Sequence, residues 1–126
     1  MKPEKQQIAI AIACGWTHEY FESDSEPLDE QMWFNPDDKE GWPRTFRSVP
    51  DYLNDLNAMQ KAEKCKQLMA VGITFNYIPN LVAVLRRDLK AYDLNDREML
   101  LACIFASAKQ RAEAFLKSLG LWEEES

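Results

Sequence analysis

The chain offers few residues that could carry out chemistry together. His18 is its only histidine, so a Ser-His-Asp or Cys-His catalytic site would have to use it. It stands between Trp16 and Tyr20 in an aromatic stretch, and no feature of the sequence places a nucleophile beside it. We therefore interpret His18 as a surface or packing residue, and we expect a protein that is not an enzyme.

The residue types that usually bind metals and cofactors also lack the required spacing. The numerous loop carboxylates do not follow the D-x-D-x-D-G pattern of a calcium site. The three cysteines, Cys14, Cys65 and Cys103, contain no C-x-x-C pair, which argues against zinc. The four glycines form no G-x-x-x-x-G-K run, which excludes a P-loop. The sequence therefore predicts no metal and no cofactor.

The cysteines and the N-terminal stretch both favour a cytoplasmic protein. All three cysteines lie in apolar surroundings, where a free thiol behaves as a small buried hydrophobe. Reduced thiols are typical of the cytoplasm. The apolar patch at 8–13 has only six residues, which is too short for a signal sequence or a membrane span. We expect no association with a membrane.

Length and charge limit the classes of function. The chain has 126 residues, the common size of one domain, and 46% of them are hydrophobic. The net charge of −6 opposes binding to nucleic acid, which requires clustered Lys and Arg. An acidic surface can instead bind a basic partner, or simply keep the protein soluble. We expect a single domain over 1–122 and an acidic disordered tail over 123–126.

The first half of the chain mixes helix and strand signals. Pro3 at a helix start and Gly15 at its end predict a helix over 3–13, although the alternation of Ile and Ala there also fits a strand. The aromatic segment 16–23 and the short segment 32–34 are interpreted as strands, separated by an acidic loop at 24–31.

A long central helix is expected next. Ser48 and Asp51 resemble a capping box, and Gly72 is placed to end the helix. Between them, apolar residues recur at helical spacing while lysines occupy much of the other face. The stripe consists of Leu53, Leu56, Met59, Ala62, Leu68 and Met69.

The second half contains two further helices and an ambiguous apolar run. Residues 73–77 have strand composition or form an extended connector, and Pro79 then starts a helix that runs to Tyr92. Seven consecutive apolar residues at 99–105 favour a buried strand, although Asn95 and Glu98 could cap a helix there instead. Ser107 and Gln110 form a capping box for a last helix that ends at Gly120.

Three blocks of this sequence resemble a known family. The segments IAIACGWT, VPDYLNDLNAMQKAEK and ASAKQRAEAFLKSLGLW, which cover about a third of the chain, are similar in order and composition to the phage ABA-sandwich domain family. The uninterrupted run from Asp51 to Met59 is the most specific part of the resemblance, and the segment 67–99 departs from the pattern. The resemblance implies an origin in a phage or prophage and a family of unknown biochemical function.

The mixture of elements predicts an α+β fold. The resemblance further implies that a small antiparallel or mixed sheet lies between helices, in α/β/α layers. The candidate protein-binding surface combines an aromatic anchor, loop carboxylates and two asparagines that are poor helix formers. Its members are Trp42, Asp37, Asp38, Asn54 and Asn57.

These features favour an accessory protein that binds a host or phage protein. The alternative is a protein that binds or sequesters a small metabolite or a signalling nucleotide. Self-association through the amphipathic 79–92 segment, giving a homo-oligomer, is a further option.

Overall fold

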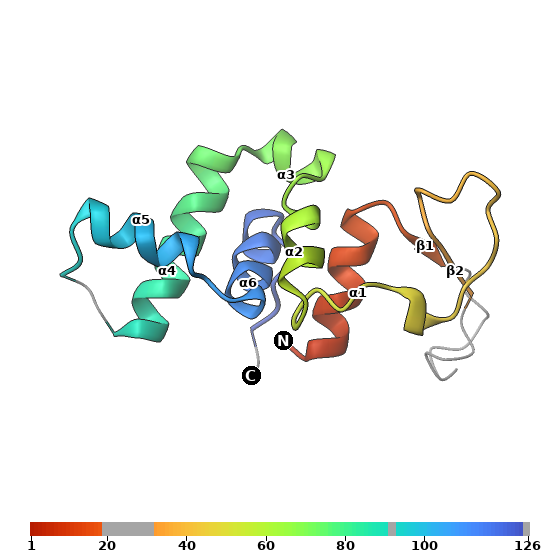
Figure 1. Ribbon diagram of the computed structural model, residues 1–126, viewed down its shortest axis with the longest axis horizontal. Coiled ribbons are helices and arrows are strands. Elements are labelled where there is room, and N and C mark those ends of the chain that lie inside the picture. The colour runs from red at the N-terminus through yellow and green to blue at the C-terminus, as the bar shows by residue number, and fades with distance from the viewer. Residues whose placement is uncertain (19–31, 91–92, 125–126) are drawn as a thin grey trace.

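The computed structural model describes residues 1–18, 32–90 and 93–124. Within these ranges the chain forms six α-helices, a π-helical segment, one 3-10 turn and one two-stranded antiparallel sheet. The predicted α+β fold is therefore confirmed in its coarse form, with helices dominating. Figure 1 shows the sheet at one end of the molecule and α5 at the other, with α1, α2 and α6 between them. The three-layer arrangement stays a prediction.

The first helix confirms its start and stop signals. Helix α1 (Pro3–Ala13) begins at Pro3 and buries Ile10 completely. Gly15 follows with a φ of +100°, a conformation that glycine adopts without steric cost. Two backbone hydrogen bonds of 3.0 Å then close the end, from Gly15 N–H to the carbonyl of Ile12 and from Trp16 N–H to that of Ala11. These caps explain why the alternating Ile–Ala run is a helix.

The sheet is short and antiparallel. Strand β1 (Thr17–His18) pairs with β2 (Trp33–Phe34), so that Thr17 lies opposite Phe34 and His18 opposite Trp33. The strand predicted over 32–34 is thereby confirmed. Of the strand predicted over 16–23, residues 17 and 18 form β1. The rest of that strand and the predicted loop over 24–31 fall within residues 19–31, which lie outside the described ranges. A single 3-10 turn, η2 (Phe46–Ser48), follows β2.

The single central helix was a wrong prediction, because the chain forms two short helices instead. They are α2 (Leu56–Ala62) and α3 (Lys66–Val71), with an extended Cys65 before α3. Ser48 is not the cap, since Pro50 disfavours helical backbone in the residue before it. The cap is Asp55, whose carboxylate accepts the backbone N–H of Asn57 at 3.0 Å. Gly72 ends α3 as predicted.

The segment 73–77 is neither a strand nor an extended connector. It forms the π-helix η3 (Ile73–Tyr77), which continues into α4 (Ile78–Leu89). The amphipathic helix predicted from Pro79 is confirmed: Leu81 and Leu85 are buried, while Leu89 is exposed. Tyr92, the expected end of the helix, lies outside the described residues.

The apolar run at 99–105 is helical, so the preferred strand prediction was wrong and its alternative was right. Helix α5 (Asp96–Ile104) starts at a capping box in which Asn95 Oδ1 accepts the backbone N–H of Glu98 at 2.8 Å. The local cap outweighs strand composition, because periodicity alone cannot assign a short apolar run.

The last helix, α6 (Ala108–Ser118), lies at the centre of the fold. Its predicted caps are confirmed. Ser107 and Gln110 cap its start, and Leu121 N–H donates to the carbonyl of Leu116 at 2.8 Å beyond Gly120. Helices α1, α2, α3 and α4 and the segment η3 all contact α6. Its fully buried residues are Ala112, Ala114, Phe115 and Leu116.

Arg111 on α6 holds four of these elements together. Its Nη1 pairs with Glu63 Oε1 at 3.1 Å, beyond the end of α2. Its Nη2 donates to the carbonyls of Cys103 at 3.0 Å and Ile104 at 3.1 Å, at the end of α5. Tyr77 of η3 donates to Glu63 Oε2 at 2.6 Å. Burial and then this hydrogen bond raise the pKa of Tyr77, so that its hydroxyl stays protonated.

Replacing Arg111 should therefore destabilise the fold strongly. The change Arg111→Met removes the partner of a largely buried carboxylate, whose side chain is 17% exposed, and uncaps α5. We expect the free energy of unfolding to fall by about 3–5 kcal/mol in denaturant titrations. The matched control is Arg86→Met, at an exposed arginine that makes no ion pair with another described residue. Equal stability of the two variants would contradict the role of Arg111.

Candidate functional site

The chain from β2 onward folds back on itself as a ribbon, residues 33–44, which we call the Trp42 ribbon. Trp33 and Arg44 exchange two backbone hydrogen bonds, of 2.8 and 2.7 Å, which close the ribbon. Within the loop, Asn35 accepts the backbone N–H of Asp37 at 2.9 Å and Asp38 accepts that of Glu40 at 3.0 Å. The loop is thus ordered by its own side chains.

Trp42 projects from this ribbon beside carboxylates. Its side chain is 64% exposed, and its Nε1 donates to Glu40 Oε2 at 2.6 Å. Asp38 pairs with Arg44 at 3.2 Å, and Asp37 pairs with Lys61 of α2 at 3.3 Å. The pKa of Asp38 lies below its usual range because it accepts the backbone N–H of Glu40 and, secondarily, pairs with Arg44.

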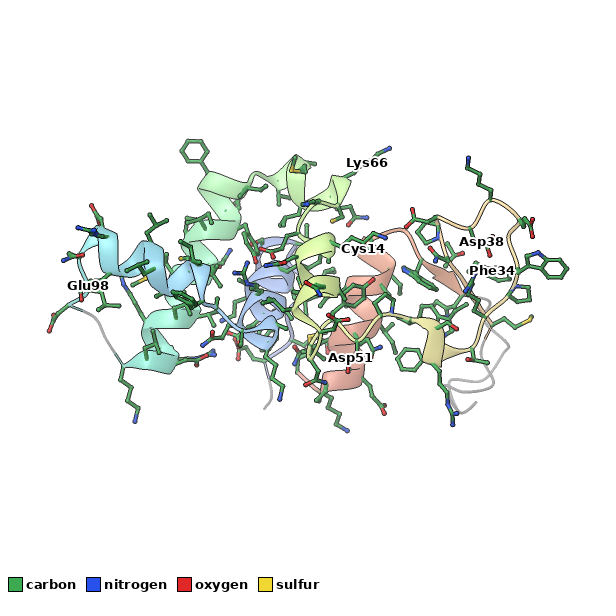
Figure 2. All side chains as sticks on the ribbon, viewed as in Figure 1. Cys14, Phe34, Asp38, Asp51, Lys66 and Glu98 are labelled. Atoms are coloured by element: carbon green, nitrogen blue, oxygen red, sulfur yellow. The ribbon has the colours of Figure 1, made fainter. Side chains whose placement is uncertain are left out.

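The two asparagines of the predicted surface lie elsewhere. Asn54 donates to both carboxylate oxygens of Asp51 at 3.1 Å, and the backbone N–H of Asn57 is capped by Asp55. Figure 2 shows Asp51 well away from Asp38. The structure therefore brings Trp42, Asp37 and Asp38 together on one ribbon and places Asn54 and Asn57 near the start of α2, where Asn54 binds Asp51 and the backbone of Asn57 is capped by Asp55.

A pocket lies between α1, α2 and the base of the ribbon. Its volume is about 440 Å³, within the range of small-molecule sites. It has aromatic, thiol and cationic walls, and Figure 2 shows the labelled Cys14 beside α2. Among the lining residues are Cys14, Cys65, Trp16, Tyr52, Lys61 and Lys64. Nothing in the sequence signalled this pocket, because its walls come from segments 50 residues apart.

The two cysteines of the pocket are close neighbours. The thiol of Cys65 and the hydroxyl of Tyr52 lie within hydrogen-bonding reach of Cys14. Burial, followed by the proximity of Cys65, raises the pKa of Cys14 to about 12. Burial and the neighbouring Cys14 raise the pKa of Tyr52 as well. Both groups are therefore neutral at physiological pH, and the pocket wall that they form carries no charge.

His18 was predicted to be either a surface residue or a packing residue, and it packs against an aromatic ring. Its ring stacks on Trp33, with centroids 4.5 Å apart and planes inclined by 17°. In the described ranges no group of three or more His, Cys, Asp and Glu side chains is placed to hold a metal ion. Nor is any helix there long and apolar enough to cross a membrane.

Sequence reasoning also missed the outer face of α5. Four large apolar side chains are exposed there although the seven-residue apolar run had suggested burial on all sides. The exposed fractions are 63% for Leu100, 49% for Leu101, 57% for Ile104 and 81% for Phe105.

Comparison with protein-family models, with curated proteins and with solved structures found no match to this chain. The resemblance to the phage ABA-sandwich domain family therefore stays a prediction.

The raised pKa of Cys14 predicts an unreactive thiol. Because only the thiolate reacts, moving the pKa from 9.0 to about 12 should slow alkylation. Near neutral pH the thiolate fraction falls by about 1000-fold. We expect Cys14 to react with iodoacetamide at least ~100-fold more slowly in the folded chain than in denaturant. Peptide mass spectrometry would measure both rates, and equal rates would contradict the buried environment.

Proposed function

We propose that this protein acts by binding a basic segment of another protein through the Trp42 ribbon. The observation that carries the proposal is the 64% exposed side chain of Trp42 on an internally braced loop. Tryptophan is among the residues that most often dominate binding energy at protein interfaces. An exposed tryptophan beside carboxylates suits a partner that offers both apolar surface and positive charge.

The bracing of the ribbon supports this role. Binding costs less when the contacting side chains are already ordered, because little conformational entropy remains to be lost. The ion pair Asp38–Arg44 and the backbone hydrogen bonds between Trp33 and Arg44 hold the ribbon to itself, and the exposed pair Asp37–Lys61 links it weakly to α2. The hydrogen bond to Glu40 fixes the indole edge. Trp42 is therefore presented in a defined orientation.

The charge of this part of the chain supports a basic partner. Residues 19–40 contain nine Asp and Glu and a single Lys. Such a concentration of negative charge accelerates association with positive surfaces and disfavours acidic ones. A basic protein segment is thus the occupant that both the aromatic anchor and the charge favour.

The resemblance to phage proteins supports a biological setting for this binding. We infer a phage-derived or prophage-derived accessory protein, a single α/β/α-layered domain that binds a host or phage protein in the bacterial cytoplasm. The binding requires no bond-making chemistry, in keeping with the absence of catalytic spacing in the sequence.

A second candidate function is the binding of a small metabolite or signalling nucleotide. The pocket of about 440 Å³ supports it, because aromatic walls at Trp16 and Tyr52 and the cations Lys61 and Lys64 line one cavity. Aromatic rings suit a base, and ammonium groups suit phosphate.

The first candidate predicts that partner capture depends on Trp42. We expect Trp42→Ala to weaken binding of the captured protein at least ~30-fold, since a central tryptophan commonly contributes more than about 2 kcal/mol. Binding should also weaken as salt rises from about 0.1 to 0.5 M, because the carboxylates become screened. Crosslinked capture from a lysogenic cell, followed by titration with the purified partner, would measure both effects.

The matched control is Phe75→Ala, which removes an aromatic side chain that is 87% exposed on η3. Capture should be unchanged in this variant. Capture that survives Trp42→Ala undiminished would contradict the proposal.

The second candidate predicts a ligand that accompanies the protein through purification. Heating the pure chain should release an ultraviolet-absorbing compound, and Lys64→Ala should reduce its amount several-fold. Lys64 is the suitable residue because it lines the pocket and makes no ion pair with another described side chain. A clear supernatant with no absorbing compound, from both proteins, would count against this candidate.

A further inference from the structure

Helix α5 exposes its large apolar residues to solvent and turns its small residues toward the core, which is unusual for an isolated domain. Its inward face consists of Met99 and the small residues Ala102 and Cys103, which pack against the core. Its outward face consists of larger residues, and their positions follow one helical stripe. We call this stripe the α5 face; its members are Leu100, Leu101, Ile104 and Phe105.

The size of the α5 face matches what an interface requires. At the exposed fractions of its members, between 49% and 81%, the face presents roughly 400 Å² of apolar surface, since a large aromatic side chain offers about 150–250 Å² and Leu or Ile somewhat less. A patch of about 400 Å² is comparable to the largest apolar patch on a typical monomer, and such patches are often functional. A stable dimer buries about 800 Å² on each subunit, some 65% of it apolar. The α5 face with a polar rim approaches that area.

The charge of this segment favours a second copy of the chain as the partner that covers the α5 face. Residues 78–105 contain four Lys and Arg and four Asp and Glu, so this segment is neutral in a chain of net charge −6. Figure 2 shows Glu98 of α5 at one end of the molecule and Asp38 of the Trp42 ribbon at the other. Two copies that meet through α5 therefore keep their Trp42 ribbons far apart. The neutral segment adds no repulsion between two chains that each carry a net charge of −6.

We propose that the α5 face binds a second copy of this chain, with the two α5 helices antiparallel. Arg97 occupies the same stripe, one turn before Leu101, and Phe105 lies one turn after it. A two-fold axis near Leu101 then places Arg97 of one copy beside Phe105 of the other, where a cation can lie over the ring. Antiparallel packing also opposes the two helix dipoles favourably.

The end of α5 that would form this contact is held in place by hydrogen bonds. Arg111 donates to the carbonyls of Cys103 and Ile104, so the end of the helix that carries Phe105 is anchored to the core. The dimer would present two Trp42 ribbons at its far ends, and so two binding sites for a partner. The inference stands independently of the proposed function, because it concerns a different surface.

Analytical ultracentrifugation of the full chain over a concentration series tests the proposal. We expect wild-type protein to sediment as a dimer, and Leu101→Asp and Ile104→Asp to weaken dimerisation at least ~30-fold. Both substitutions replace exposed side chains, so circular dichroism should show unchanged helix content. The matched control is Met69→Asp, at an apolar residue of α3 that is 59% exposed, which should leave the dimer intact.

A cross-linking measurement tests the position of the axis. The variant L101C should form an intermolecular disulfide on mild oxidation, because the two copies of residue 101 face each other, whereas wild type should not. A wild-type chain that stays monomeric at all concentrations, or α5 variants that dimerise as well as wild type, would overturn the proposal. Loss of the dimer with retained Trp42-dependent capture would leave the proposed function standing.

Discussion

Helices α2, α5 and α6 and the segment η3 meet at one largely buried ion pair, between Arg111 and Glu63. The guanidinium of Arg111 joins α6 to Glu63 beyond α2, to the last turn of α5 and, through the shared carboxylate, to Tyr77 of η3. A largely buried charge of this kind is tolerated only because every donor has a partner. The short helices of this chain would be marginal alone, and the cluster fixes their mutual orientation.

The fold separates two surfaces of opposite character. At one end, the Trp42 ribbon combines an exposed indole with carboxylates in a loop braced by hydrogen bonds. At the other, the α5 face is apolar and electrically neutral. Their separation along the molecule allows one surface to associate with itself while the other recognises a basic partner. Neither role requires catalytic groups, and the protein is proposed to work by binding alone.

Part of the candidate site could be predicted from the sequence. Trp42 precedes a proline in an irregular acidic segment, and such a tryptophan has no regular element in which to be buried. Asn54 and Asn57 carried a weaker signal, since polar residues near a helix start often make local hydrogen bonds, as Asn54 does here with Asp51. The pocket and the α5 face had no local signal, because each depends on which segments meet in space.

The helix ends marked by Pro3, Gly15, Ser107 and Gly120 could be predicted from the sequence, and Asn95 was the weaker of two predictions there. These signals are local, since a cap satisfies backbone groups within one turn of its own position. Tertiary structure decided the division of the central helix, the π-helical segment before α4 and the outward side of α5. The physical reason is that apolar spacing shows that a face is to be covered, whereas only packing decides what covers it.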